Sequence, residues 1–104
     1  MEEFVKQSLL YDFYGDLLTG HQKEIYGAYV LDNLSLAEIA QEYNISRQGV
    51  FDLIKRVEAT LNGYEDKLQL VQKFLSIKEK VKDIHNCGSL EEAKKAADNI
   101  LELL

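Results

Sequence analysis

Apolar residues recur at intervals of three and four along most of this 104-residue chain, which is the spacing of amphipathic helices. The first stripe predicts a helix over about residues 2–15. A second helix is expected from Gly20 to Val30, because Thr19 and Gln22 form a T-x-x-Q capping box at its start. Proline is absent, so nothing but glycine and short polar clusters interrupts the helices. The pattern predicts an all-α fold.

Two short helices with a tight connection are expected next, in the stretch LSLAEIAQEYNISRQGVFDLIKRV. Ser35 and Glu38 repeat the capping box as S-x-x-E and begin the first helix. Asn44 stands where a left-handed C-cap is needed, and Ser46 can cap the second helix. Because the connection is so short, the two helices must meet at an angle. This arrangement is a helix-turn-helix, expected over residues 35–57.

The two faces of this helix pair differ in chemistry. The inward side chains are expected to be Ile39, Ala40, Ile45, Val50 and Ile54. A helix-turn-helix places its second helix in the major groove, where arginine pairs with guanine and glutamine with adenine, while lysine and arginine also reach phosphates. The DNA-binding residues expected from this geometry are Ser46, Arg47, Gln48, Phe51, Asp52, Lys55 and Arg56. The alternative is a solvated polar face on a structural helix pair.

The apolar register continues beyond Asn62-Gly63, where the helix begun at Ser46 is expected to bend or end. A seam with a seven-residue repeat runs on for about three heptads. Its members are Ile54, Val57, Leu61, Tyr64, Leu68, Val71 and Leu75. Two regions are therefore expected: residues 1–62, which contain the helix-turn-helix, and residues 63–104, a C-terminal helical extension in the same compact unit or at a dimer interface.

A last helix is expected after Ser89, which begins another S-x-x-E box and follows the helix stop Asn86-Cys87-Gly88. Its apolar stripe consists of Leu90, Ala93, Ala97, Ile100, Leu101 and Leu104.

The length of the seam predicts a homodimer, because it exceeds what a three-helix head domain needs to cover its own core. Helix-turn-helix proteins also usually read two half-sites through a dimer. The expected interface consists of Ile54, Leu61, Tyr64, Leu68, Val71 and Leu75. The alternative is intramolecular, with the first or the last helix folded over the seam.

The charge of the chain limits how it can bind nucleic acid. Eighteen acidic residues face twelve basic ones, for a net charge of −6, so nonspecific attraction to phosphate should be weak. Within residues 46–57 the balance inverts, with Arg47, Lys55 and Arg56 against Asp52. A local basic face on an acidic body is therefore expected. The acidic body would also suit docking to a basic protein.

Other chemistries have little support in the sequence. His85 and Cys87 form an H-x-C pair, but a zinc site needs four ligands and His21 is the one further imidazole, so no metal or cofactor is expected. There is no Ser/His/Asp spacing and no glycine-rich phosphate loop, so an enzyme is not expected. The single cysteine excludes an intramolecular disulfide, and without a signal sequence or a long apolar span the chain is expected to be cytoplasmic.

The run LTGHQKEIYGAYVLDNLSLAEIAQEYNISRQGVFDLIKRV resembles region 4 of bacterial sigma factors, through its L-T-x-x-Q opening, its S-L-x-E-I-A helix and its S-R-x-x-V recognition helix. With LYDFYGDLLT before it and YEDKLQLVQKF after it, the chain resembles the small YlxM-like proteins of Gram-positive bacteria over about residues 9–75. Gly49 and Phe51 depart from the alanine and tyrosine that related sequences tend to carry. The resemblance implies a sigma-region-4-like fold and a regulatory role linked to the signal recognition particle pathway.

Three functions stay open. The first is a DNA-binding regulator that acts in the signal recognition particle pathway and uses residues 46–56. The second is an adaptor whose basic helix binds signal recognition particle RNA or protein instead of DNA. The third is a module that binds only other proteins. A salt series separates them, because a phosphate-contacting protein loses affinity with a log-linear slope and a hydrophobic docking site loses little.

Overall fold

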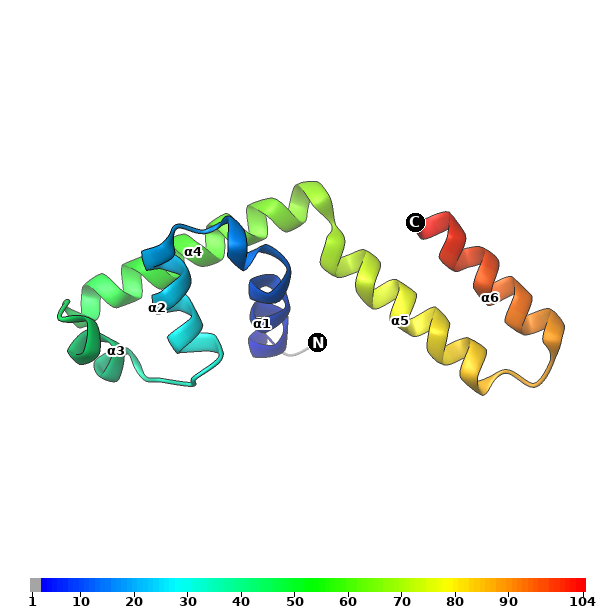
Figure 1. Cartoon of the computed structure of the whole chain (residues 1–104), viewed down its shortest axis with the longest axis horizontal. Helices are drawn as coiled ribbons and strands as arrows, with labels where there is room; N and C mark the ends of the chain where they lie inside the picture. The colour runs from blue at the N-terminus through cyan, green and yellow to red at the C-terminus, as the bar shows by residue number, and fades with distance from the viewer. Residues whose placement is uncertain (1–2) are drawn as a thin grey trace. The chain divides into compact units, whose positions relative to one another are not determined.

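The computed structural model describes residues 3–104, which form helices joined by turns and short loops, with no strand among them. Two compact units divide after Leu68. Unit 1 contains, in chain order, α1 (Glu3–Tyr14), the 3₁₀ helix η1 (Gly15–Leu17), α2 (Gly20–Val30), α3 (Leu36–Tyr43) and α4 (Arg47–Leu68) (Figure 1). Unit 2, from Gln69 onward, contains α5 (Leu70–Asn86) and α6 (Leu90–Leu103). The expected all-α fold is confirmed.

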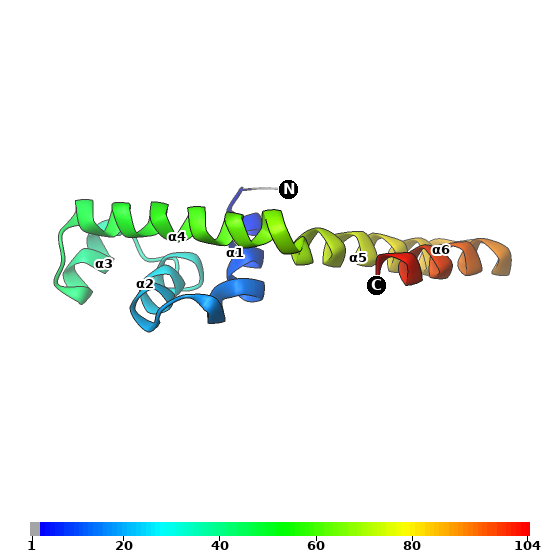
Figure 2. The same ribbon diagram turned by 90° about the horizontal axis from the view of Figure 1, so that it is seen from above.

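The long helix α4 organises unit 1. Helices α1, α2 and α3 all pack against it; in Figure 2, α2 and α3 lie on one side of α4 and α1 crosses it. The side chains that are most completely buried between them are Tyr14, Ile25, Tyr26, Ile39, Val50, Val57 and Leu61. The other four tyrosines are half-buried, so the tyrosines lie on the apolar side of their helices. One face of α4 is thus committed to the core and the opposite face is left to solvent.

The helix starts follow the capping chemistry of the sequence. Thr19 Oγ1 accepts the N–H of Gln22 at 3.3 Å, and the Gln22 side chain accepts the N–H of Thr19 at 3.4 Å. The predicted bounds of α2 are confirmed. For the first helix, the predicted start at residue 2 lies outside the described residues, and its end at Tyr14 is one residue short of the prediction.

Of the two outcomes expected at Asn62-Gly63, an end of the helix is wrong. Helix α4 continues through Gly63 to Leu68, and the next residue, Gln69, has a left-handed backbone with φ of 55°. Glycine in a helix interior costs only roughly 0.5–1 kcal/mol relative to alanine. Burial of neighbouring apolar residues such as Leu61 outweighs that cost. The sequence placed the domain boundary after Asn62, and a separate role for the extension stays a prediction.

We expect Gly63→Ala to raise the free energy of unfolding by about 0.5–1 kcal/mol. A Cβ at this position would meet no atom within 4 Å. The matched control is Gly27→Ala, whose Cβ would lie 2.7 Å from the hydroxyl of Tyr11 and should lower stability. That hydroxyl donates to the carbonyl oxygen of Lys23 at 3.0 Å, so it cannot move without loss. Urea unfolding of both variants measures the difference, and destabilisation by Gly63→Ala would contradict a continuous α4.

Unit 2 is an antiparallel pair of helices joined by a short turn (Figure 1). The predicted helix stop is confirmed, because α5 ends at Asn86. Ser89 Oγ accepts the N–H of Glu92 at 3.2 Å and so caps α6. The Glu92 carboxylate accepts the N–H of Gly88 rather than that of Ser89, so the S-x-x-E sequence forms only half of the expected capping box.

Candidate nucleic-acid interface

The turn between α3 and α4 is built from local hydrogen bonds. Asn44 adopts the left-handed conformation, with φ of 55° and ψ of 46°. The next residue, Ile45, donates its N–H to the carbonyl of Ala40 at 3.1 Å, which closes the end of α3. Ser46 Oγ then accepts the N–H of Gly49 at 2.9 Å and caps α4. The predicted helix-turn-helix is present, with both caps at the expected residues.

Helix α3 begins with the complete capping box that the sequence predicted. Ser35 Oγ accepts the N–H of Glu38 at 3.1 Å, and the Glu38 carboxylate accepts the N–H of Ser35 at 3.0 Å. The pKa of Glu38 is lowered mainly by the hydrogen bond from the Ser35 backbone and, to a smaller extent, by that from the Ser35 side chain.

The lowered pKa of Glu38 predicts how the stability of the protein depends on pH. A carboxyl group with a lowered folded-state pKa contributes stability above its ordinary pKa, and this contribution disappears as the pH falls through the lowered value. Glu38→Gln keeps an acceptor for the N–H of Ser35 but does not titrate. We therefore expect its free energy of unfolding to fall less steeply at acid pH than that of the unaltered protein. Urea unfolding at several pH values tests this, and identical acid slopes would contradict it.

The recognition surface predicted from the sequence lies on one exposed side of α4 and its cap. All seven expected residues are solvent-exposed: Ser46, Arg47, Gln48, Phe51, Asp52, Lys55 and Arg56. The opposite side of the same helix holds the buried residues Val50, Ile54 and Val57. We call the seven exposed residues the α4 outer face. That DNA binds to this face stays a prediction.

Side chains on the α4 outer face already interact with one another. Gln48 donates its amide to Asp52 at 2.9 Å. The ammonium of Lys55 lies 5.5 Å from the centre of the Phe51 ring and 3.7 Å from the carboxylate of Glu58. Arg47 and Arg56, in contrast, form no ion pair with any residue from 3 to 104. Within the described residues these two guanidinium groups are therefore free for an anionic ligand, whereas the exposed Lys55 ammonium would have to exchange its contact with Glu58 for one.

Glu58 holds α4 against the helices behind it, a role the sequence reasoning missed. Its side chain is only 15% exposed. Its carboxylate accepts hydrogen bonds from the Gln7 side-chain amide on α1 and from the Tyr26 hydroxyl on α2, the latter at 3.3 Å. The pKa of Tyr26 is raised mainly by burial of its hydroxyl and, to a smaller extent, by the nearby charge of Glu58. The available signal was the position of Glu58, four residues after Ile54 and three before Leu61, on the edge of the buried stripe.

The six residues predicted for a dimer interface differ in how deeply they are buried. Ile54 and Leu61 belong to the core of unit 1 and are 4% and 0% exposed, so neither offers a surface to a second chain. The others are Val71, which is buried, Tyr64 and Leu75, which are half-buried, and Leu68, which is 48% exposed. A continuous seam also requires one helix, and α4 ends at Leu68. Homodimerisation stays a prediction.

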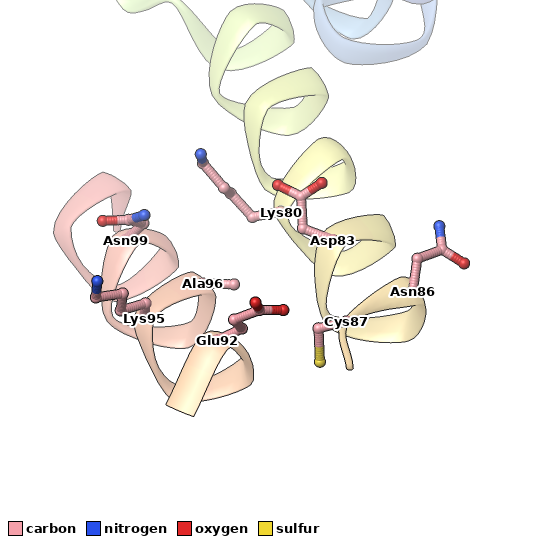
Figure 3. Close-up of a pocket in the computed structure, with 8 residues that line it drawn as sticks. All are labelled: Lys80, Asp83, Asn86, Cys87, Glu92, Lys95, Ala96 and Asn99. Carbon is pink, nitrogen blue, oxygen red and sulfur yellow. The ribbon is translucent and has the colours of Figure 1, made fainter. Parts of the chain in front are cut away.

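Unit 2 carries an open pocket of about 410 Å³ between α5 and α6 (Figure 3). Its walls carry both charges, from Lys80, Asp83, Glu92 and Lys95. The thiol of Cys87 donates to the carbonyl of Ile84 at 3.0 Å. No group of three His, Cys, Asp or Glu side chains in the described part of the chain is placed to hold a metal ion. No helix of that part has the length and apolarity needed to cross a bilayer.

The capped turn and the exposed face of its second helix define a helix-turn-helix protein. The chain belongs to the UPF0122 family, whose model matches residues 1–100 and is described as "Putative helix-turn-helix protein, YlxM / p13 like". UPF0122 protein YlxM of Bacillus subtilis is 45% identical over 107 residues, which cover 100% of this chain and 97% of that protein. The resemblance to YlxM-like proteins is confirmed, and the link to the signal recognition particle pathway stays a prediction.

Other relatives show the same likeness. A UPF0122 protein of Caldanaerobacter subterraneus subsp. tengcongensis is 48% identical over 86 residues, which cover 83% of this chain and 74% of that protein. A UPF0122 protein of Bacillus pumilus is 42% identical over 104 residues, which cover 100% of this chain and 94% of that protein.

Proposed function

We propose that the protein is a DNA-binding regulator that reads the major groove with the α4 outer face. The observation that carries this proposal is the helix-turn-helix whose second helix exposes Arg47 and Gln48 in its first turn. That turn is the part of a recognition helix that reaches base edges. Arg56 lies more than two turns further along and suits a phosphate of the DNA backbone.

The charge distribution supports specific rather than nonspecific binding. Unit 1 contains six basic and twelve acidic residues, and three of the six bases, Arg47, Lys55 and Arg56, belong to the α4 outer face. Elsewhere unit 1 repels phosphate, so few phosphate contacts can form. With two or three such contacts, log K should fall with log salt with a slope of about −2 to −3. Most of the discrimination must then come from base contacts.

The test is retardation of genomic DNA fragments in gels at low salt, followed by selection of the bound fragments. We expect a subset of fragments to be retained with a common sequence element. If no fragment is retarded by the unaltered protein at low salt, the DNA-binding proposal fails.

The pathway is part of the same proposal. The resemblance to YlxM-like proteins supports a regulator linked to the signal recognition particle pathway. One competitor is an adaptor that binds the RNA or protein of that particle instead of DNA, and the acidic surface of unit 1 suits docking to a basic protein. Pull-down from lysate with and without nuclease separates the two. Retention of the same protein partner after nuclease treatment would favour the adaptor.

A homodimer also belongs to this proposal, because paired half-sites are the usual target of a helix-turn-helix. Two copies would let a small number of contacts per chain give useful affinity, since each chain brings one α4 outer face.

A further inference from the structure

The helix pair of unit 2 has one polar side and one apolar side. The polar side carries the pocket of Figure 3, lined by Lys80, Asp83, Lys95 and Asn99 among others. A second set of side chains is apolar and recurs at intervals of three, four and seven on both helices. They are Ile77, Val81 and Ile84 on α5 with Leu90, Ala97, Leu101 and Leu104 on α6.

Helix geometry places these residues on one surface. On α6, Ala96 is buried and Ile100 is half-buried, which marks the side that faces α5. At about 100° per residue, Leu90 and Leu101 lie roughly a quarter turn away from that side. On α5 the pocket residues Lys80 and Asp83 mark the polar side, and at the same angle per residue Val81 lies roughly 100° or more around the helix from both. Because the helices are antiparallel, both stripes lie on the side opposite the pocket, and we call them the hairpin apolar face.

The apolar side chains of this face are unusually exposed to solvent. Val81 is 51% exposed, Leu101 69%, Leu90 72% and Leu104 83%. Contiguous apolar surface of this kind on a soluble domain marks a site of interaction. The pair also buries little of its own apolar surface, because Val71 and Ala96 are the only buried residues of unit 2 (Gln69–Leu104).

The two edges of the hairpin apolar face carry opposite charge. Beyond the apolar stripe of α5 lie the exposed lysines Lys78 and Lys82. Beyond the stripe of α6 lie three exposed acids and one lysine: Glu91, Lys94, Asp98 and Glu102. A surface with one basic and one acidic edge is complementary to a copy of itself.

We propose that the hairpin apolar face binds the same face of a second copy of this chain and forms a four-helix bundle. A twofold axis parallel to the helices sets α5 of one chain over α6 of its partner, so each basic edge meets an acidic edge. All neighbouring helices are then antiparallel, as in bundles with short loops. The other twofold arrangement, with α5 over α5, brings like charges together and is disfavoured.

This interface differs from the seam that contains Leu68. It is also independent of the proposed DNA binding, because it is measured without nucleic acid. If the protein does not bind DNA, the proposed dimer interface is unaffected. If the protein is a monomer, it can still bind a half-site.

The first test is sedimentation of the full chain and of single variants. We expect the unaltered protein to sediment as a dimer and Val81→Lys and Leu101→Lys to sediment as monomers. Circular dichroism should show unchanged helicity, since both side chains are exposed within one chain. Leu68→Lys is the matched control, also at an exposed apolar position, and should remain dimeric. The proposal is overturned if the unaltered protein is monomeric at high micromolar concentration, or if Leu68→Lys alone dissociates it.

The second test reverses the charged edges. The variant Lys78→Glu/Lys82→Glu has two acidic edges, and the variant Asp98→Lys/Glu102→Lys has two basic edges. Each should self-associate at least about tenfold more weakly than the unaltered protein, from the repulsion of several partly exposed pairs. An equimolar mixture of the two should form a heterodimer, because every acidic edge then meets a basic one. Equal self-association of all three proteins would overturn the proposed pairing of α5 with α6.

Discussion

Replacing Leu61 with alanine should lower the free energy of unfolding by about 2–5 kcal/mol. Leu61 is 0% exposed and lies in the core of unit 1, in the part of α4 that packs against the other helices of that unit. Removing the Cγ and the two methyl carbons there loses the burial of those atoms and leaves a cavity that packed neighbours fill only in part. Thermal or urea unfolding monitored by circular dichroism measures the loss.

The matched control is Leu68→Ala, one heptad further along the same seam. Leu68 is 48% exposed, so its truncation should change the free energy of unfolding by no more than about 0.5 kcal/mol. The loss at Leu61 should not depend on protein concentration, because the burial is within one chain. A loss that disappears on dilution would instead assign Leu61 to contacts between chains.

The capping residues explain why most helix starts could be predicted. Thr19, Ser35, Ser46 and Ser89 each accept the N–H of the residue three positions on, and each interaction depends only on local sequence. The left-handed turn at Asn44 follows from equally local chemistry. These short-range interactions are independent of what packs around them, so the sequence is enough to place them.

The course of α4 near its end could not be predicted in this way. Gly63 is a weak breaker whose effect is overridden by core packing, and Gln69 adopts the left-handed conformation although glutamine does not favour it. Neither outcome is visible in local propensities, because both depend on which side chains meet in the folded protein. Unit 1 accordingly extends to Leu68, beyond the boundary after residue 62 that the sequence predicts.

The α4 outer face was predictable as a set of exposed positions, since a periodic stripe fixes both its buried and its exposed side. The contacts between side chains on this face could not be predicted from the sequence. Lys55 meets Phe51 and approaches Glu58 through the rotamers of long side chains, and the contacts of Glu58 with Gln7 and Tyr26 join segments far apart in sequence. Sequence spacing therefore treats Lys55 and Arg56 as equivalent, whereas their surroundings differ.

Arg47→Ala should weaken binding to a preferred DNA site by about 1–3 kcal/mol, or roughly 5- to 150-fold, and relax sequence preference. Arg47 is exposed in the first turn of α4 and forms no ion pair with the described residues, so its guanidinium can meet a guanine edge. Affinity for unrelated DNA should fall much less. Fluorescence anisotropy with the selected site and a scrambled duplex measures both values.

The three bases of the α4 outer face should respond differently to the same test. Arg56→Ala should weaken all sequences alike and reduce the salt slope by about one, as loss of a phosphate contact does. Lys55→Ala should have a smaller effect, because the Lys55 ammonium already interacts with Phe51 and Glu58. Lys67→Ala, in the last turn of α4, is the control and should leave affinity unchanged. If Arg47→Ala weakens the selected and scrambled duplexes equally, Arg47 contacts phosphate, and base recognition must come from another part of the α4 outer face.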